Sequence, residues 1–357
     1  MVAPICATSR REPEKRRLPD RLVTDKGLPP VGPVSLTRDM SSVAIFAPSP
    51  TLTVTVEEHE SGDEIHIHAG GQGVWQARML RTLGVDVTLC CVITGESGSV
   101  LRHILEDEGV DVAVVERAGR GAAYVQDRRE GHREVLAEED GDALDRHELD
   151  ELYSLTLREG LTAGLAILSG PNADSVLDAD TYRRLASDLR AGGARVVVDL
   201  AGDRLRSALE GRVDVLKLSD EELVADGFAA DDEVASIRAA MRRLREDGAD
   251  TVIVTRAPEP SLLLDADGFL EVTPPSLETV DTRGAGDSLT AGVVSAMTRG
   301  ESAREAITLG AAAGALNVTR HGLGTGDGEA IRLLRETVSV SLLPDADEGV
   351  SNEEDGR

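Results

Sequence analysis

The feature that most constrains the fold is an alternation of short, continuously apolar runs with amphipathic stretches. The apolar runs are rich in Val, Ile and Leu and fall at 43–47, 85–92, 165–169, 195–200, 213–218 and 251–255. Stretches with helical periodicity separate them, near 74–83, 100–108, 181–191, 232–246 and 303–318. Strands that are apolar on both sides must be covered on both sides. The pattern therefore predicts an α/β fold, a doubly wound and mostly parallel sheet with helices on both faces.

Two segments break this alternation. Residues 51–56 with 63–68, and 122–126 with 133–137, alternate apolar and polar side chains with the period of half-exposed strands. We predict two antiparallel hairpins, near 51–68 and 121–137, that form a small β lid over the mouth of the α/β domain.

The two ends of the chain differ from this region. Residues 1–42 hold six of the fourteen prolines and show no periodic apolar pattern, which predicts a disordered N-terminal extension. Met40 is an alternative start of translation, just before the first apolar run. Residues 344–357 form an acidic tail with little to bury. The domain with its lid is therefore expected over residues 43–336.

Charge and cysteine usage exclude several function classes. Acidic residues outnumber basic ones 65 to 38, and the net charge of −27 argues against a nucleic-acid-coating protein. No apolar run approaches the roughly 18 residues of a membrane helix, and no signal-peptide pattern opens the sequence. Three cysteines without metal-like spacing favour a reducing compartment, so we expect a cytoplasmic protein. The acid-rich, lysine-poor composition fits either a concentrated-salt cytoplasm or a GC-rich genome.

The strongest chemical signal is VDTRGAGDSLTAGVVSAM at residues 280–297. Gly284, Ala285 and Gly286 form a turn directly before a helix of small residues, where free backbone N–H groups attract anions. Asp287 follows in the first turn, where a carboxylate can take a proton from a hydroxyl while the N–H groups stabilise a transferring phosphoryl group. The structural alternative is an N-capping aspartate after an ordinary glycine turn.

DTRGAGDS resembles the DTxGAGD signature of the ribokinase-like, PfkB-type carbohydrate kinases. AGGQGVWQARMLRTLG, at residues 69–84, resembles the first signature of that family, GGKGxNxAxxLxxLG. Within the family, the chain looks closest to the 1-phosphofructokinase and tagatose-6-phosphate kinase group. The resemblance covers residues 43–336 and implies a ribokinase-like fold. It also implies ATP-dependent phosphorylation of a hydroxyl on a small-molecule sugar or sugar phosphate.

The resemblance implies a role for each matching residue. Asp287 would be the catalytic base, and residues 284–286 the anion hole. The other matching positions belong to the acceptor, nucleotide and metal sites. Gly70 and Gly71 would approach the acceptor, and Thr255, Arg256 and Asn317 would lie near the nucleotide. LKLSDEE, at residues 216–222, stands in place of KPNxxE, so that Ser219 replaces an asparagine and Glu222 would order Mg²⁺ through water. ATP, Mg²⁺ and a monovalent cation near Asp281 are the implied cofactors, and a homodimer through the lid is the implied assembly.

The acceptor motifs depart from the family pattern. Thr53 stands where an aspartate is expected to bind sugar hydroxyls, Gln72 replaces a lysine, and Trp75 replaces an asparagine. The lid motif TRxNxK corresponds to GAAYVQ at residues 121–126. Binding a phosphate usually takes Arg or Lys. Either the acceptor carries no phosphate, or Arg128 binds it together with the other arginines of the lid turn, Arg129 and Arg133.

Two other function classes stay open. The altered acceptor motifs favour a non-catalytic relative that binds a nucleotide or sugar in a regulatory role, whereas the intact GAGD favours catalysis. A kinase of a non-sugar alcohol, such as a nucleoside, is the second alternative. A dehydrogenase is disfavoured, because no strand leads into GxGxxG with an acid about 20 residues later. We interpret His66 and His68 as a solvated lid face, and Cys90 and Cys91 as core residues.

Overall fold

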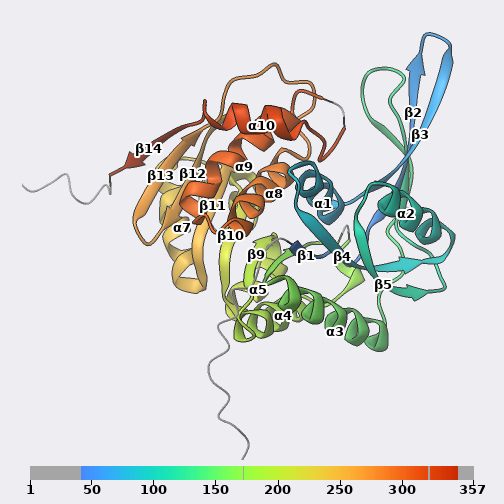
Figure 1. The fold of residues 1–357 in the computed structure, drawn as a ribbon, viewed down its shortest axis with the longest axis horizontal. Helices are drawn as coiled ribbons and strands as arrows, with labels where there is room; N and C mark the ends of the chain where they lie inside the picture. Colours follow the sequence, from blue (N-terminus) through green and yellow to red (C-terminus); the bar gives the residue numbers. More distant parts are fainter. Residues whose placement is uncertain (1–41, 172, 321, 345–357) are drawn as a thin grey trace, which may run out of the picture. The chain divides into compact units, whose positions relative to one another are not determined.

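The computed structural model describes residues 42–171, 173–320 and 322–344, and it confirms the α/β architecture (Figure 1). The main sheet has ten strands in the order β14-β13-β12-β11-β10-β9-β8-β1-β4-β5. Its parallel strands are β1 (Ser42–Phe46), β4 (Asp86–Thr94), β5 (Asp111–Arg117), β8 (Leu165–Ser169), β9 (Arg195–Asp199), β10 (Val213–Ser219) and β11 (Ala249–Arg256). At one edge, β12 (Glu259–Asp265), β13 (Gly268–Thr273) and β14 (Ser339–Leu343) pair in antiparallel fashion.

The sheet is covered on both faces, as its continuously apolar strands require. In β9, Val197 packs into one core while Val196 and Val198 pack into the other. Helices that contribute to the first core are α1 (Gln72–Thr82), α2 (Gly95–Asp107), α8 (Ala285–Thr298), α9 (Ala303–Asn317) and α10 (Gly328–Arg335). Those of the second core are α3 (Arg146–Ala163), α4 (Asp180–Ala191), α5 (Gly202–Gly211), α6 (Asp220–Ala225) and α7 (Val234–Asp247).

The two predicted hairpins form one separate four-stranded sheet, the lid. Its strands are β2 (Thr51–His59), β3 (Gly62–Gly70), β6 (Ala123–Asp127) and β7 (Glu134–Glu139), in the order β3-β2-β6-β7. Parallel pairing of β2 with β6 joins the hairpins, and β2 and β3 extend away from the domain as a long ribbon (Figure 1). Because strand side chains alternate, the register puts Thr55 and Gln126 on one face and Val54 with Ile67 on the other.

Some elements lie outside the predicted set. The amphipathic stretches did not include α3, α5, α6 or α10, and the strand runs did not include β5, β12, β13 or β14. β14 pairs with β13 along its whole length, so the sheet extends past residue 336. The predictions for the N-terminal extension and the acidic tail concern residues 1–42 and 344–357, which lie almost entirely outside the described residues.

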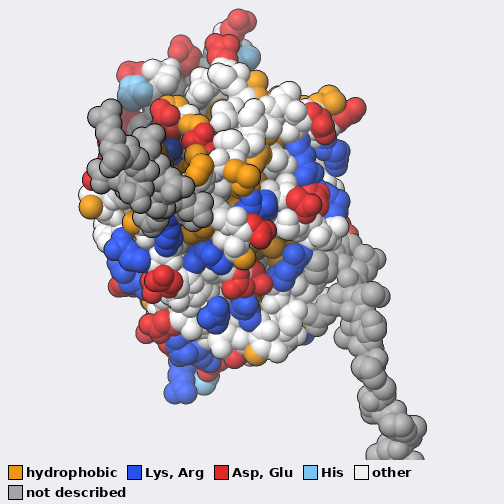
Figure 2. All heavy atoms as spheres, turned by 90° about the vertical axis from the view of Figure 1, so that its left-hand side faces the viewer, with side chains coloured by type: hydrophobic (Ala, Val, Ile, Leu, Met, Phe, Trp, Pro, Cys, Tyr) orange, Lys and Arg blue, Asp and Glu red, His pale blue; other side chains and the backbone are white. Residues whose placement is uncertain are grey.

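The described surface mixes both signs of charge. Figure 2 shows acidic and basic side chains interspersed among uncharged ones on one face of the molecule. Within residues 42–344, apart from the two undescribed positions, no helix is both long and apolar enough to cross a membrane.

Candidate active site

The GAGD turn forms the start of α8. Gly284 is the N-cap residue and has a φ of 69°, a left-handed conformation that glycine adopts without a steric penalty. The Ser288 N–H donates to the Gly284 carbonyl at 2.9 Å, closing the first helical turn. The N–H groups of Gly286 and Asp287 precede that bond and have no helical acceptor. The turn therefore supplies donors for an anion beside the Asp287 carboxylate.

Lys217 of β10 lies directly behind this turn. A Cβ on Gly286 would sit 2.5 Å from Lys217 Nζ, so a larger residue there would displace the ammonium group. Lys217 is 7% exposed, and its Nζ lies 3.1 Å from Asp199 Oδ1 at the end of β9. Burial lowers the pKa of Lys217, but the charges of Asp199, Asp287 and Glu222 outweigh burial and raise it above its usual value. Lys217 therefore stays charged.

Asp287 is a buried acid with a strongly shifted pKa. Burial and the nearby charge of Asp199 raise its pKa from 3.8 to about 8, against the opposing effect of Lys217; Glu222 raises it further. A Gln76 amide hydrogen bond to Oδ1, at 3.4 Å, lowers the pKa. A carboxyl group with a pKa near neutrality is suited to proton transfer.

The segment expected to bind metal starts α6. The Ser219 hydroxyl accepts a hydrogen bond from the Glu222 N–H at 3.1 Å, and Glu222 Oε2 accepts from the Ser219 N–H at 2.7 Å. This capping box explains both residue types locally. Within the described chain, the hydrogen bonds of Glu222 involve only Oε2 and its backbone, which leaves Oε1 for an outer ligand.

A cavity of about 280 Å³ lies between the lid and the domain. Thr53 and Gln126 of the lid line it, and Trp75 of α1 lines its domain side. Thr53 Oγ1 and Gln126 Oε1 are buried and find no hydrogen-bond partner within the described part of the chain. Polar walls with an aromatic side chain suit a polyol. Gly70 lies against Thr53, since a Cβ on Gly70 would sit 2.8 Å from Thr53 Oγ1, and Gly71 follows it as the N-cap residue of α1.

Of the three lid-turn arginines, Arg128 lines this cavity. Its Nη2 lies 3.4 Å from Asp281 Oδ2, across the boundary between lid and domain. Arg283, which the sequence did not single out, also lines the cavity and binds both oxygens of Asp281, with Nη2 at 2.7 Å from Oδ2 and Nε at 3.2 Å from Oδ1. The Arg283 hydrogen bond is the main reason that the pKa of Asp281 lies below its usual value.

The other two lid-turn arginines have partners of their own. Arg129 binds Asp127 and Asp63 at the lid tip, and Arg133 stacks over the Tyr124 ring at 4.9 Å from the centroid. The structure thus brings one member of the predicted arginine group to the cavity.

Several predicted contact residues bond within the protein instead. Asn317 donates to the Arg283 carbonyl at 2.7 Å and accepts from the Gly324 N–H at 3.0 Å, so it joins the loop before α8 to the 322–326 loop. Gln72 Oε1 accepts from the Gly170 N–H at 2.8 Å. Thr255 donates to the Leu218 carbonyl at 3.5 Å, and Arg256 to that of Pro260 at 3.3 Å.

The lid histidines differ from one another. His66 is exposed, as expected, whereas His68 lines the cavity and lies 3.3 Å from Thr55 Oγ1. Among the described residues, no three His, Cys, Asp or Glu side chains converge as a metal site. Cys90 and Cys91 are buried in the core, as predicted.

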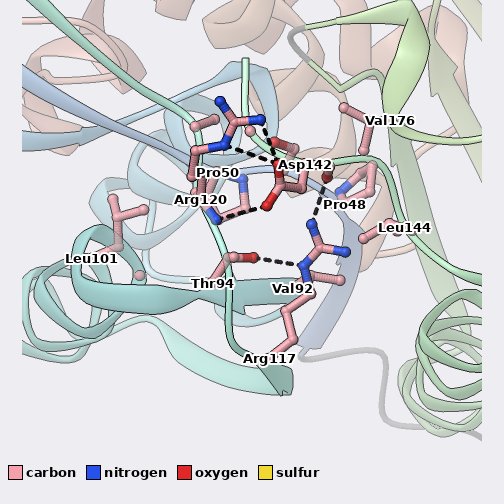
Figure 3. Close-up of a pocket in the computed structure, with 15 residues that line it drawn as sticks. Pro48, Pro50, Val92, Thr94, Leu101, Arg117, Arg120, Asp142, Leu144 and Val176 are labelled. Carbon is pink, nitrogen blue, oxygen red and sulfur yellow. Dashed lines mark hydrogen bonds and ion pairs between the residues drawn. The ribbon is translucent and has the colours of Figure 1, made fainter. Parts of the chain in front are cut away.

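A second hollow, shown in Figure 3, lies beside Pro48 and Pro50. Its volume of about 20 Å³ holds no more than about one water molecule. Its arginines are occupied: Arg117 donates to Thr94 Oγ1 at 3.1 Å, and Arg120 to Asp142 Oδ1 at 2.8 Å. We therefore place ligand binding at the cavity between the lid and the domain.

The chain has counterparts in a known family. Residues 42–329 match the family described as "pfkB family carbohydrate kinase", and the chain belongs to that family of enzymes. The 1-phosphofructokinase of Bacillus subtilis (strain 168) is 28% identical over 285 residues, which cover 77% of this chain and 89% of that protein.

Solved structures confirm the ribokinase-like fold. Escherichia coli phosphofructokinase-2 in complex with potassium superposes with a TM-score of 0.73 at 23% identity, covering 83% of this chain and 98% of that one. Arabidopsis thaliana ribokinase complexed with ribose and ATP gives a TM-score of 0.64 at 20% identity, again covering 83% and 98%.

Proposed function

We propose that this carbohydrate kinase transfers the γ-phosphoryl group of ATP to a hydroxyl of a sugar phosphate, with Asp287 as the general base. The observation that carries the proposal is the Asp287 carboxylate, buried in the first turn of α8 beside N–H groups that have no helical acceptor. The carboxylate takes the proton of the acceptor hydroxyl, while the N–H groups stabilise the charge on the transferring phosphoryl group.

The residues divide this chemistry between them. The acceptor hydroxyl lies against Asp287, which accepts its proton as the hydroxyl oxygen attacks the γ-phosphorus and the bond to ADP breaks. The Gly286 and Asp287 N–H groups donate to the phosphoryl oxygens. Lys217, charged and directly behind Gly286, adds positive potential at the same place. The lid excludes water that would otherwise accept the phosphoryl group.

Glu222 fits a Mg²⁺ ion bound through water. Its Oε1 makes no hydrogen bond within the described residues, whereas both Asp199 oxygens accept hydrogen bonds, from Lys217, Gln76 and Thr290. When bound with ATP, Mg²⁺ would neutralise phosphate charge. Our candidates for contacts with ATP stay Ser219, Thr255 and Arg256. Asn317 would support ATP binding indirectly, by holding the loop before α8 in place.

The acceptor phosphate is assigned to Arg128 and Arg283. Both line the cavity, and both now share one carboxylate, Asp281. A dianionic phosphate offers these guanidinium groups more acceptor oxygens than that carboxylate does. Trp75 would contact the sugar ring from the domain side.

A screen of ADP release tests this assignment. We expect the fastest release with a ketohexose phosphate such as fructose 1-phosphate or fructose 6-phosphate, weaker release with free hexoses, and the least with nucleosides. Preference for a neutral polyol would overturn the phosphate assignment. ATP binding without ADP release under the whole panel would instead support a non-catalytic, regulatory relative.

A monovalent cation at Asp281 would meet competition. Arg283 Nη2 and Nε, its backbone N–H and Arg128 Nη2 already surround the carboxylate at 2.7, 3.2, 3.1 and 3.4 Å. We therefore propose that any such cation binds beside Asp281 rather than on its carboxylate.

The outer face of the lid favours a homodimer. Ile65 and Ile67 are 67% and 54% exposed and lie opposite Val56 and Val54 in the register. An apolar sheet face of this kind is typical of an interface, and we propose that a second copy of the chain covers it. Ile67→Lys should then convert a dimer into a monomer in sedimentation.

For localisation, the cytoplasm stays our proposal, because ATP is available there.

A further inference from the structure

Gln76 joins the two buried acids of the active site. It belongs to α1 and is fully buried, and its Nε2 lies 3.4 Å from Asp287 Oδ1 and 3.2 Å from Asp199 Oδ2. At its other end, the Ser169 hydroxyl donates to Gln76 Oε1 at 2.6 Å. The amide nitrogen thus faces both acids and the amide oxygen faces Ser169, and a carboxyl oxygen can accept from the amide whether the group is charged or protonated.

The chemistry at this position leaves little choice of side chain. An amide nitrogen carries two protons, one for each carboxylate, and adds no charge. A glutamate would add a third acid, and an apolar side chain would leave two buried carboxylate oxygens without this donor. Trp75, the preceding residue, faces the acceptor cavity instead, so adjacent positions of α1 serve different parts of the site.

We propose that Gln76 is a positioning residue for the base, an inference that rests on the proposed role of Asp287. By holding Oδ1, it turns Oδ2 toward the acceptor hydroxyl. By holding Asp199 from the same nitrogen, it keeps the Asp199–Lys217 pair at a fixed distance from the base. Ser169 in turn fixes the orientation of the amide.

The charges around Asp287 show what Gln76 would change. Asp199 on β9 and Glu222 on α6 raise the pKa of Asp287 above the effect of burial, while Lys217 on β10 and the Gln76 hydrogen bond lower it. Loss of that hydrogen bond removes a contact that favours the charged, proton-accepting form. Asp287 would then lose its proton, and so become able to act as a base, only at a higher pH.

The test compares pH profiles of kcat for Gln76→Met, which matches the length of glutamine, with wild type. In wild type, kcat should fall toward low pH with an apparent pKa near that of Asp287, about 8; this fall is the acid limb of the profile. We expect the limb of Gln76→Met to move up by about one pH unit, which lowers kcat about tenfold at neutral pH with recovery at high pH. KM values should stay within about twofold. Ser169→Ala, which only frees the amide, should move the limb in the same direction but less.

Trp75→Phe is the contrasting variant, since it should change the acceptor KM and leave the acid limb in place. A uniform loss of kcat at all pH values in Gln76→Met, with an unmoved limb, would overturn the positioning role. If Gln76→Met fails to fold, an unmoved limb in Ser169→Ala overturns it equally. An acid limb that persists in Asp287→Asn would instead contradict the assignment of Asp287 as the base. Failure of the Gln76 role and failure of the base assignment can therefore be told apart.

Discussion

At the scale of single residues, the site concentrates charge where water is excluded. Asp199, Lys217 and Asp287 are each less than a tenth exposed and interact with one another. Two acids around one buried lysine leave an excess of negative charge, and the fold relieves it by favouring a proton on Asp287. Such an arrangement serves proton transfer at a cost in stability.

This cost predicts the effect of Asp287→Asn on stability. Since the folded-state pKa of about 8 lies above the value of 3.8 for an unfolded chain, ionised Asp287 destabilises the fold increasingly as the pH rises from about 4 to about 8. The amide removes that effect. Thermal melts should therefore show a Tm above wild type by a few degrees at pH 8 and a smaller difference at pH 4.5. An equal difference at both pH values would contradict the raised pKa.

Sequence patterns located only part of this cluster. Asp287 and the glycines share one contiguous motif, so they could be predicted. Asp199, Lys217 and Gln76 come from three elements far apart in the chain, and only the sheet order brings them together. Two signals did exist: a lysine inside an otherwise apolar strand, and an aspartate at the carboxyl end of another, where ligands bind in such sheets.

At the scale of elements, the lid strands and α1 together line the candidate acceptor cavity. Period-two alternation predicted both hairpins, but the pairing of β2 with β6 depends on backbone hydrogen bonds that no local pattern encodes. For the same reason, the sequence could not separate Arg128, which reaches the domain, from Arg129.

Arg128 and Arg129 therefore make a matched pair of variants. Arg128→Ala should raise the KM for a sugar phosphate by about 10- to 100-fold, because it removes a charge-assisted contact inside the cavity. Arg129→Ala, at the neighbouring position outside the cavity, should change KM less than about twofold. Steady-state kinetics at low salt will measure both. Equal effects of the two substitutions would indicate general attraction by lid charge rather than a binding contact.

At the scale of the whole molecule, the excess of acidic residues is the dominant property. At a net charge of −27, the excess acidic side chains repel one another in the folded state, even though both signs of charge are interspersed on the face in Figure 2. Added salt screens that repulsion over distances of about 10 Å at 0.1 M and less at higher concentration.

We accordingly expect the Tm to rise from low salt to molar KCl if the composition reflects a salt-rich cytoplasm. Differential scanning calorimetry across a KCl series measures this directly. A flat or falling Tm would favour genome composition as the origin of the low lysine content.

The central claim is that Asp287 takes the acceptor proton within an otherwise intact site. Its most direct test is acceptor-dependent ADP release by Asp287→Asn, measured alongside ATP binding by calorimetry. An amide of the same shape cannot accept that proton, so turnover should fall by about 10²–10⁴-fold while ATP affinity stays within a few-fold of wild type. Retention of more than about a tenth of wild-type turnover, with normal ATP binding, would contradict the account.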